Sequence, residues 1–462
     1  MKKIFIGLMF GSIASLMPSV GMANTVVEPS SQSNTVQDKA LLNLTLAQAI
    51  EIALAENPTI RVADKDVALK QVADKEAWMN LLPSVSGNLS LSHNVKVAAM
   101  RLKMPDETGT MQTRTMKMGV DGSTTAQGGV SVNLPVFAPT VYQNMKLSKE
   151  DILLAQEKAS ASRQDLVNQV TKAYYGALLA QDSYEVMKKS YNVAKQNYDL
   201  VEQKFNVGKV SEYDKLSAEV QMRTMSSTVT STEAGMKLAM LRLKVLMGVT
   251  SDIEMTISDS LKSYEGKVLL PKEIGTNEVD NNTNIKQIDY REGLLKRTRK
   301  VLYTNFMPTI GAQFTGQYQS MSNDNWNLFK YSYSPSMTFA VNVNIPIFTA
   351  SNFTKLKSNR LQLNQLQDTR TNTYNQLSMQ AKSYRENMVS SVAKLESDRT
   401  AVEQANKAVT ISGKRYEVGR GTILELNQSE TALTQSELTY CQTIYDYLTN
   451  QADLEYTLGR NY

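Results

Sequence analysis

An uninterrupted apolar seam in residues 166–205 constrains the fold of this 462-residue chain more than any other feature. Its members are spaced alternately four and three residues apart: Leu166, Val170, Ala173, Ala177, Ala180, Tyr184, Met187, Tyr191, Ala194, Tyr198, Val201 and Phe205. Such spacing predicts a helix that packs against others in a left-handed supercoil. Between Pro135 and Gly208 we expect one helix of roughly 70 residues, about 100 Å long. A compact globular core cannot contain such a helix, so it must lie against similar helices.

The same seam recurs 211 residues later. Its second copy is Leu377, Ala381, Tyr384, Met388, Ser391, Leu395, Asp398, Val402, Ala405, Val409, Ser412 and Tyr416, with Asp398 as the clear exception to apolar character. The segment VNLPVF at 132–137 returns as VNIPIF at 343–348, and FNVG at 205–208 returns as YEVG at 416–419. Gly248 likewise returns as Gly459.

Upstream of these segments a second offset, of 225 residues, relates the two halves. It pairs Asn57 with Asn282 and Pro83 with Pro308. The two offsets differ by 14, so the first half must hold 14 extra residues between Pro83 and Pro135. The chain is therefore an internal duplication of two long repeats.

The remaining segments complete the predicted organisation. Residues 1–23 have the basic start, apolar run and small-residue cleavage site of a signal peptide. A polar segment, 24–43, precedes the first repeat, 44–248; a linker expected to pack across the middle of the helices, 249–281, precedes the second, 282–459; residues 460–462 end the chain. Without Lys2 and Lys3 the formal charge falls from +5 to +3, which indicates no nucleic-acid partner. Cys441 is the one cysteine, so no intrachain disulfide is possible, and a buried thiol is expected.

Shorter helices flank each long one. An amphipathic helix opens at Leu44, is interrupted near Pro58, and runs to about Leu82, where Pro83 ends it. After Gly208 a returning helix is expected over about 212–247, and the second repeat gives 285–307 and 423–458. Stacked end to end, two short helices would match the length of one long helix.

The hydrophobic period changes from 3.6 to 2 in four segments. Apolar or small residues alternate with polar ones at Val85, Gly87, Leu89 and Leu91; at Val130, Val132 and Leu134; at Ile310, Ala312, Phe314 and Tyr318; and at Phe339, Val341, Val343 and Ile345. Strands with one apolar and one small, polar face are typical of outer-membrane barrels, with lipid outside and water inside. A half-buried soluble sheet is the alternative, which the long helices that these strands connect disfavour.

Polar loops are expected between the paired strands, at 94–127 and at about 321–336. The first contains the 14 extra residues and carries Met100, Met104, Met111, Met116 and Met118. Thioethers can bind Cu(I), but a flexible loop in a methionine-rich chain is the preferred interpretation. We therefore expect no metal and no cofactor.

Four strands cannot close a barrel. Their edges would remain unpaired in lipid, where each orphan backbone group costs several kcal/mol. Three copies would give twelve strands, an even number as in bacterial barrels, and enough helices to enclose a channel. The pattern alone leaves two or four copies open.

The chain resembles the TolC-like outer-membrane efflux proteins, and the resemblance covers Leu44 to Gly459. It rests on the opening LTLAQAIEIALAENP at 44–58, the doubled strand exits PVF and PIF, and the doubled aromatic-x-Val-Gly turns. The resemblance implies a mainly α-helical coiled-coil barrel joined to four transmembrane β-strands per chain. It also implies a homotrimer with a twelve-stranded barrel in outer-membrane lipid and a tunnel across the periplasm. The implied partners are a periplasmic adaptor and an inner-membrane transporter, which would supply the energy, because this chain has no P-loop.

The same resemblance assigns roles at the tips of the helix hairpins, which form the periplasmic entrance. It implies that the Tyr416 hydroxyl holds the entrance shut with Asp214 and Gln203 as partners, and that Glu425 lines the narrowest point. Three copies of Glu425 would favour cations. The sequence departs from the family in two places: the latch arginine falls on Gly421, beside Arg420, and a second ring carboxylate falls on Gln428.

Ordinary structural roles compete with these assignments. Asp214 and Glu425 are third after the caps Ser211 and Thr422, where a carboxylate helps any helix to begin. Gly208 and Gly419 fit left-handed helix terminators. The family resemblance implies that these glycines, with Val207 and Val418, also meet the adaptor. Tyr416 continues the apolar seam, so core packing competes with latching.

Four functions were weighed. The first is a passive exit duct for small molecules in a tripartite efflux pump, and the second is the exit duct of a type I protein secretion system. A periplasmic adaptor or coiled-coil scaffold would show one hairpin and no bilayer-length strands. An enzyme is disfavoured because the one histidine, His93, lies at a strand edge without a paired nucleophile.

Overall fold

The computed structural model describes residues 42–105, 109–249, 255–257, 259–275, 278–322, 328 and 331–460, which belong to one unit beginning at Leu42. The predicted signal peptide, 1–23, lies outside the described residues, as does most of the polar segment that follows it. Among the described residues, no helix is long and apolar enough to cross a bilayer.

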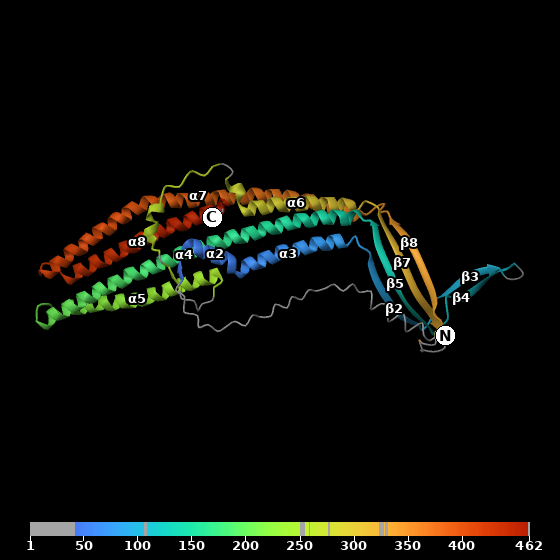
Figure 1. Ribbon diagram of the computed structural model, residues 1–462, viewed down its shortest axis with the longest axis horizontal. Coiled ribbons are helices and arrows are strands. Elements are labelled where there is room, and N and C mark those ends of the chain that lie inside the picture. Colours follow the sequence, from blue (N-terminus) through green and yellow to red (C-terminus); the bar gives the residue numbers. More distant parts are fainter. Residues whose placement is uncertain are drawn as a thin grey trace. The chain divides into compact units, whose positions relative to one another are not determined.

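Two helices of equal length dominate the fold (Figure 1). Helix α4 spans Pro139–Asn206 and α7 spans Ala350–Glu417, 68 residues each, so both ends of α7 lie 211 positions after those of α4. The returning helices α5 (Glu212–Met247) and α8 (Ile423–Thr457) begin at that same offset. The 22-residue helices α3 (Pro58–Met79) and α6 (Thr283–Thr304) are related by the second offset of 225. The duplication predicted from sequence is therefore present in the fold.

Both predicted seams point into the helix packing. No member of either seam is exposed, and Val170, Ala177, Val201 and Ala381 are fully buried. The one charged member, Asp398, accepts a 2.6 Å hydrogen bond from the Thr443 hydroxyl of α8. A carboxylate is tolerated in the seam because a neighbouring helix supplies a donor.

Pairs of short helices stack end to end, as predicted, at two equivalent joints. Asn57 caps α3 through Thr59 N (2.8 Å) and also donates from Nδ2 to the Leu246 carbonyl at the end of α5 (2.7 Å). Asn282 caps α6 through Asn284 N (2.8 Å) and donates to the Thr457 carbonyl at the end of α8 (2.9 Å). Each asparagine therefore satisfies orphan backbone groups of two helices at once.

The helix predicted to open at Leu44 begins instead at Leu46, as α2 (Leu46–Glu56). Thr45 is its N-cap and forms a capping box with Gln48, which fixes the start of the helix. Leu42–Leu44 form strand β1, which pairs in parallel with β6 (Met255–Ile257) of the linker.

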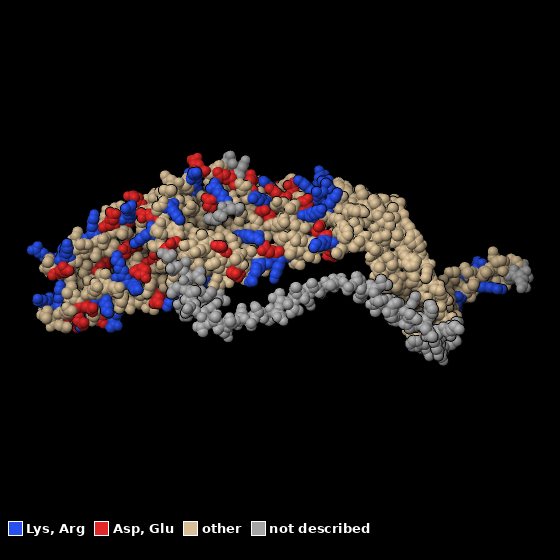
Figure 2. Space-filling model, viewed as in Figure 1, with Lys and Arg blue, Asp and Glu red and all other residues tan. Residues whose placement is uncertain are grey.

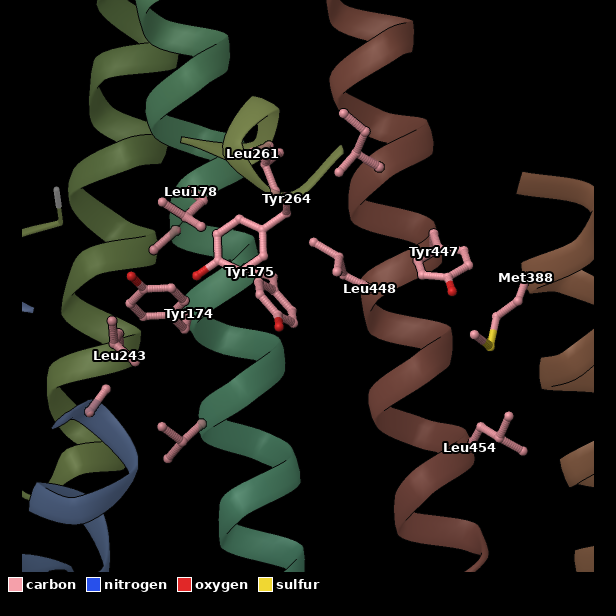
Figure 3. Packing of buried hydrophobic residues seen from close by; sticks show 14 of the residues in the cluster. Tyr174, Tyr175, Leu178, Leu243, Leu261, Tyr264, Met388, Tyr447, Leu448 and Leu454 are labelled. Carbon is pink, nitrogen blue, oxygen red and sulfur yellow. The ribbon is translucent and has the colours of Figure 1, made fainter. Parts of the chain in front are cut away.

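The main core lies where the linker crosses the helices (Figure 3). The 3₁₀ helix η1 (Leu261–Lys267) buries Leu261 and Tyr264 against α4 and α8, and η2 (Glu278–Asn281) buries Val279. Tyr174 of α4 and Tyr264 both donate to Asp259 Oδ2, at 3.0 and 2.9 Å. These buried hydrogen bonds attach the linker to the middle of the bundle.

Four antiparallel strands form one sheet in the order β2-β5-β7-β8. They span Ser84–Asn94, Ser123–Phe137, Thr309–Ser322 and Ser334–Asn344. The register aligns Val85, Val132, Phe314 and Phe339 in one row. The next row, on the other face, is Ser86, Ser131, Thr315 and Thr338. The sheet thus has the predicted apolar and polar faces, and its strands contain no Lys, Arg, Asp or Glu.

The prediction of a polar loop over 94–127 is wrong. That segment contains a second hairpin, β3 (Ala99–Pro105) paired with β4 (Met111–Lys117), and the first residues of β5. Methionine and threonine alternate there with basic residues, a pattern that suits a two-faced ribbon. The other predicted loop, about 321–336, is also too long, because β7 reaches Ser322 and β8 starts at Ser334.

A pair of glycine substitutions should show how tight the end-to-end joint is. Gly248 and Gly208 both have positive φ, 72° and 71°, but a Cβ on Gly248 would lie 2.8 Å from the Glu56 carbonyl oxygen, while one on Gly208 meets nothing within 4 Å. We expect Gly208→Ala to cost about 1 kcal/mol of unfolding free energy from backbone strain, and Gly248→Ala about 3 kcal/mol. Guanidinium unfolding in detergent measures both, and equal costs would contradict the close joint.

Candidate functional site

The tips of the two helix hairpins have the same backbone geometry. After α4, Gly208 is left-handed and Lys209 N donates to the Lys204 carbonyl (2.9 Å); after α7, Gly419 is left-handed and Arg420 N donates to the Arg415 carbonyl (2.8 Å). This six-to-one bond is the Schellman helix end, which requires positive φ at the glycine. Both glycines therefore have the terminator role that the sequence predicted.

The valines before these glycines have no visible role in the fold. Val207 and Val418 are 67% and 70% exposed at the turns. An apolar side chain displayed at both tips is consistent with contact to another protein, and the proposed docking role stays a prediction.

Both predicted cap carboxylates lie at helix starts, but they bond differently. Asp214 Oδ2 accepts from the Ser211 hydroxyl (2.7 Å) and from Ser211 N (3.2 Å), which completes a capping box. Glu425 N donates to the Thr422 hydroxyl (3.2 Å), and the Glu425 side chain does not return the bond. The Asp214 carboxylate is therefore engaged in capping α5, whereas the Glu425 carboxylate makes no capping bond and can contact another group.

Arg415 forms an ion pair with Glu425 at the tip. Its Nη1 lies 3.6 Å from Glu425 Oε2, and its Nη2 donates to the Arg420 carbonyl at 3.3 Å. The approach depends on Gly421, because a Cβ there would lie 3.1 Å from Arg415 Cβ and 3.2 Å from Tyr416 N. The side chain of Arg420, the residue that sequence reasoning singled out, is exposed, and Arg415 was missed.

Tyr416 joins all four helices near the tips. It is 6% exposed and packs with Val201 of α4, Ala218 of α5, and Ile423 and Leu426 of α8. Lys204 Nζ lies 4.4 Å from the centroid of its ring and 3.5 Å from its carbonyl oxygen. Tyr416 therefore packs in the core between the hairpins, with a cation from α4 over its ring.

The latch hydrogen bonds implied by the family resemblance are not formed within this single chain. Among the described residues, the buried Tyr416 hydroxyl has no hydrogen-bond partner, and Gln203 is exposed. Burial first, and then the nearby Asp214 carboxylate, raise the pKa of Tyr416 above its ordinary value. Asp214 is thus close enough to act on Tyr416 electrostatically without bonding to it.

Sequence reasoning missed a buried carboxyl group between the hairpins. Glu430 of α8 is 7% exposed, and its Oε1 accepts from Asn197 Nδ2 of α4 at 2.6 Å. Burial raises the pKa of Glu430, and the Asn197 hydrogen bond partly offsets that rise. The signal was present, because Glu430 continues the four-and-three spacing from Ile423 and Leu426.

Gln428, predicted at the narrowest point, lines a groove of about 880 Å³ between α5 and α8. Its lining is uncharged: Tyr213, Leu216, Ser217, Val220, Gln221, Leu424, Asn427, Gln428, Thr431, Ala432 and Gln435. Such a surface offers hydrogen bonds and apolar contact but no fixed charge.

Two helix hairpins are joined at mid-length, and the helices lead into a sheet whose strands carry no charged residues. This arrangement matches one family. The family model for outer membrane efflux protein covers residues 49–249 and 278–460, which is most of the chain. The chain belongs to the outer membrane efflux protein family. It is an export duct of the outer membrane that extends into the periplasm.

Individual relatives are distant in sequence and close in fold. The efflux protein is 22% identical to the alkaline protease secretion protein AprF of Pseudomonas aeruginosa over 71% of this chain and 69% of AprF. It is 18% identical to the outer membrane protein TolC of Vibrio cholerae over 72% of this chain and 76% of TolC. The CmeC outer membrane channel of Campylobacter jejuni superposes with a TM-score of 0.68 at 16% identity, covering 90% of this chain and 85% of CmeC.

Removing one oxygen atom separates packing from latching at Tyr416. Because the hydroxyl is buried without a partner in the single chain, Tyr416→Phe should leave the free energy of unfolding unchanged or raise it by up to about 1 kcal/mol. Tyr416→Ala should cost about 3 kcal/mol through the cavity that it leaves. Detergent unfolding and single-channel conductance measure the two effects. If Tyr416→Phe instead destabilises the protein and raises its conductance, the Tyr416 hydroxyl does hold the entrance shut.

Glu430 should make the stability of the efflux protein pH-dependent. Its pKa is raised in the folded state, so the folded state binds the proton more tightly and stability is lost as pH rises from about 4.5 through the raised value. Glu430→Gln cannot ionise, so its stability relative to the wild type should increase as the pH rises above about 4.5. Melting temperatures at several pH values measure this, with the exposed Glu417→Gln as control. Parallel pH profiles for wild type and Glu430→Gln would refute it.

Proposed function

We propose that three copies of this efflux protein assemble into a closed duct with twelve strands in the outer membrane. One observation carries the proposal: the sheet order β2-β5-β7-β8 leaves a free edge on β2 and another on β8. In lipid these backbone groups must be paired, so β2 of one copy would pair with β8 of the next. The apolar face of the sheet would meet lipid, and the Ser, Thr, Asn and Gln face would line the pore.

The helices leave matching open edges. On the sheet side α4 lies between α3 and α6, and α7 follows α6; toward the tips α4 lies between α5 and α8, and α7 follows α8. One edge is therefore formed by α3 and α5 and the other by α7. Large apolar residues are exposed on these helices: Val62, Leu69 and Val72 of α3, Val220, Leu238 and Val245 of α5, and Leu361, Met379 and Ile411 of α7. Neighbouring copies would cover them.

In the proposed pump an inner-membrane transporter supplies energy and a periplasmic adaptor connects it to the hairpin tips. The exposed Val207 and Val418 and the left-handed turns at Gly208 and Gly419 support docking at the tips. The duct itself would be passive and catalyse no reaction. Its predicted pore-facing strand residues are uncharged, which suits transit without tight binding.

Small toxic molecules are the proposed cargo, in a tripartite efflux pump. Protein export by a type I secretion system is the second candidate, favoured by the similarity to the alkaline protease secretion protein AprF. Both cargoes need the same duct, so the architecture does not separate them.

Two measurements test this function in order. Light scattering of the purified protein in detergent should give three times the mass of one chain. A monomeric mass would contradict the proposed trimeric duct. A deletion strain should then become sensitive to toxic compounds, with its secreted proteins unchanged. Normal drug resistance together with a missing secreted protein would favour the type I alternative.

Charge variants should locate the entrance. If Glu425 lines the narrowest point of the trimer, Glu425→Gln should lower the cation preference of single channels in planar bilayers. Arg415→Gln should raise it, because Arg415 lies 3.6 Å from Glu425 and offsets its charge. Reversal potentials in a salt gradient measure both variants. If both variants keep the cation preference of the wild type, Glu425 does not line the constriction.

A further inference from the structure

The β3–β4 hairpin is a large asymmetry between the two repeats in the described part of the chain. It lies between Pro83 and Pro135, the part of the first repeat that holds 14 more residues than its counterpart in the second. The hairpin joins β2 to β5 at the strand ends opposite those that lead to α3 and α4 (Figure 1). Because the helices extend into the periplasm, the hairpin lies on the outer side of the membrane.

Its register makes the hairpin amphipathic. The pairs Met100–Met116, Leu102–Arg114 and Met104–Gln112 lie on one face, which is therefore mostly apolar. The pairs Ala99–Lys117, Arg101–Thr115 and Lys103–Thr113 lie on the other, which is basic. All of these side chains are exposed. A lone two-stranded ribbon with an uncovered apolar face is marginal in water and gains stability from a surface to lie on.

Charge returns abruptly at the hairpin (Figure 2). The four strands of the sheet carry no Lys, Arg, Asp or Glu, whereas β3 and β4 carry Arg101, Lys103, Arg114 and Lys117 and no acid. The sequence places Asp106 and Glu107 in the connecting turn, outside the described residues, and residues 96–121 still keep five basic against three acidic residues.

Hydrogen bonds hold the base of the hairpin in place, and one of its four cations, Lys117, is paired there with Asp121. Asp121 accepts from Val97 N (2.8 Å) and pairs with Lys117, whose hydrogen bond is the main cause of the lowered pKa of Asp121. Met118 N also donates to the Ala98 carbonyl (2.8 Å). Arg101, Lys103 and Arg114 are exposed, and none of the described carboxylates pairs with them.

We propose that this hairpin lies on the outer leaflet and binds the phosphate groups of its glycolipids. The methionine and leucine face would rest at the boundary of the acyl region, and Arg101 and Lys103 on the other face would reach the phosphates. Arg114, which lies on the apolar face, would extend its side chain to the phosphates that surround the ribbon. Arginine is suited to phosphate because its planar guanidinium donates two parallel hydrogen bonds. The proposal depends on the outer-membrane location and not on which cargo is exported.

Lipid binding by the purified full-length protein tests this. The probe is a fluorescent hexa-acylated lipid A with both phosphates, compared with the same lipid after phosphate removal. We expect R101Q/K103Q/R114Q to bind the phosphorylated lipid about 100-fold more weakly, since each cation near an anionic surface contributes about five-fold. The matched control is K382Q/K394Q/K407Q, which removes three exposed lysines of α7 and should bind as the wild type does.

Two further readouts separate the alternatives. L102S/M116S should weaken binding by disrupting the apolar face, and none of the hairpin variants should change single-channel conductance. Equal binding of lipid with and without phosphates, or wild-type affinity in the triple variant, would overturn the proposal. Changed conductance with unchanged lipid binding would also overturn it, because the hairpin would then lie over the pore.

Discussion

The structure depends on one constraint: backbone N–H and C=O groups cannot remain without hydrogen-bond partners in lipid. A four-stranded sheet with an apolar face can enter a bilayer only if its two edge strands find partners, and no other strand of the described chain pairs with β2 or β8 on their free sides. Assembly is therefore a condition for membrane insertion in the proposed duct. A second driving force acts at the helices, whose open edges display apolar side chains that a neighbouring copy would cover.

The duplication explains how one chain forms a long helical layer in which pairs of shorter helices match the length of α4 and α7. Two continuous helices and two broken pairs lie side by side, and the breaks occur where Asn57 and Asn282 each cap one helix while bonding to the end of another. Gly248 and Gly459 allow the close approach, since a Cβ on either would contact backbone within 3 Å. The linker places Leu261 and Tyr264 in the main core, against α4 and α8. Stability is thus concentrated at mid-length.

Periodicity could predict most of the fold because burial in this molecule repeats regularly. The seams from Leu166 and from Leu377, the ends of the long helices and the two faces of the sheet all follow from spacing. The β3–β4 hairpin did not, because its residues alternate between methionine and basic side chains, which composition alone marks as a polar loop. At the tips, helix-end chemistry predicted Gly208, Gly419 and the cap at Asp214. The partners Lys204 and Arg415 depend on which long side chains meet across helices, and spacing does not specify that.

The balance of contacts changes along the interface between the two hairpins. At mid-length α4 and α8 share an apolar core that includes Leu178, Ile444 and Leu448. Toward the tips the same two helices meet through the Ser190–Thr434 hydroxyl pair (3.1 Å), the Lys189–Glu437 ion pair (3.1 Å) and the Asn197–Glu430 hydrogen bond. A smaller apolar cluster lies there around Tyr416, with Val201, Ala218, Ile423 and Leu426.

Polar pairs can exchange their partners for water at little cost, whereas apolar surface cannot. Separation of the hairpins therefore costs least at the tips and most at the linker. Glu430 strengthens this gradient, because a carboxyl group with one neutral donor gains hydration when the helices part. The entrance proposed at the tips could thus open without loosening the core that holds the repeats together.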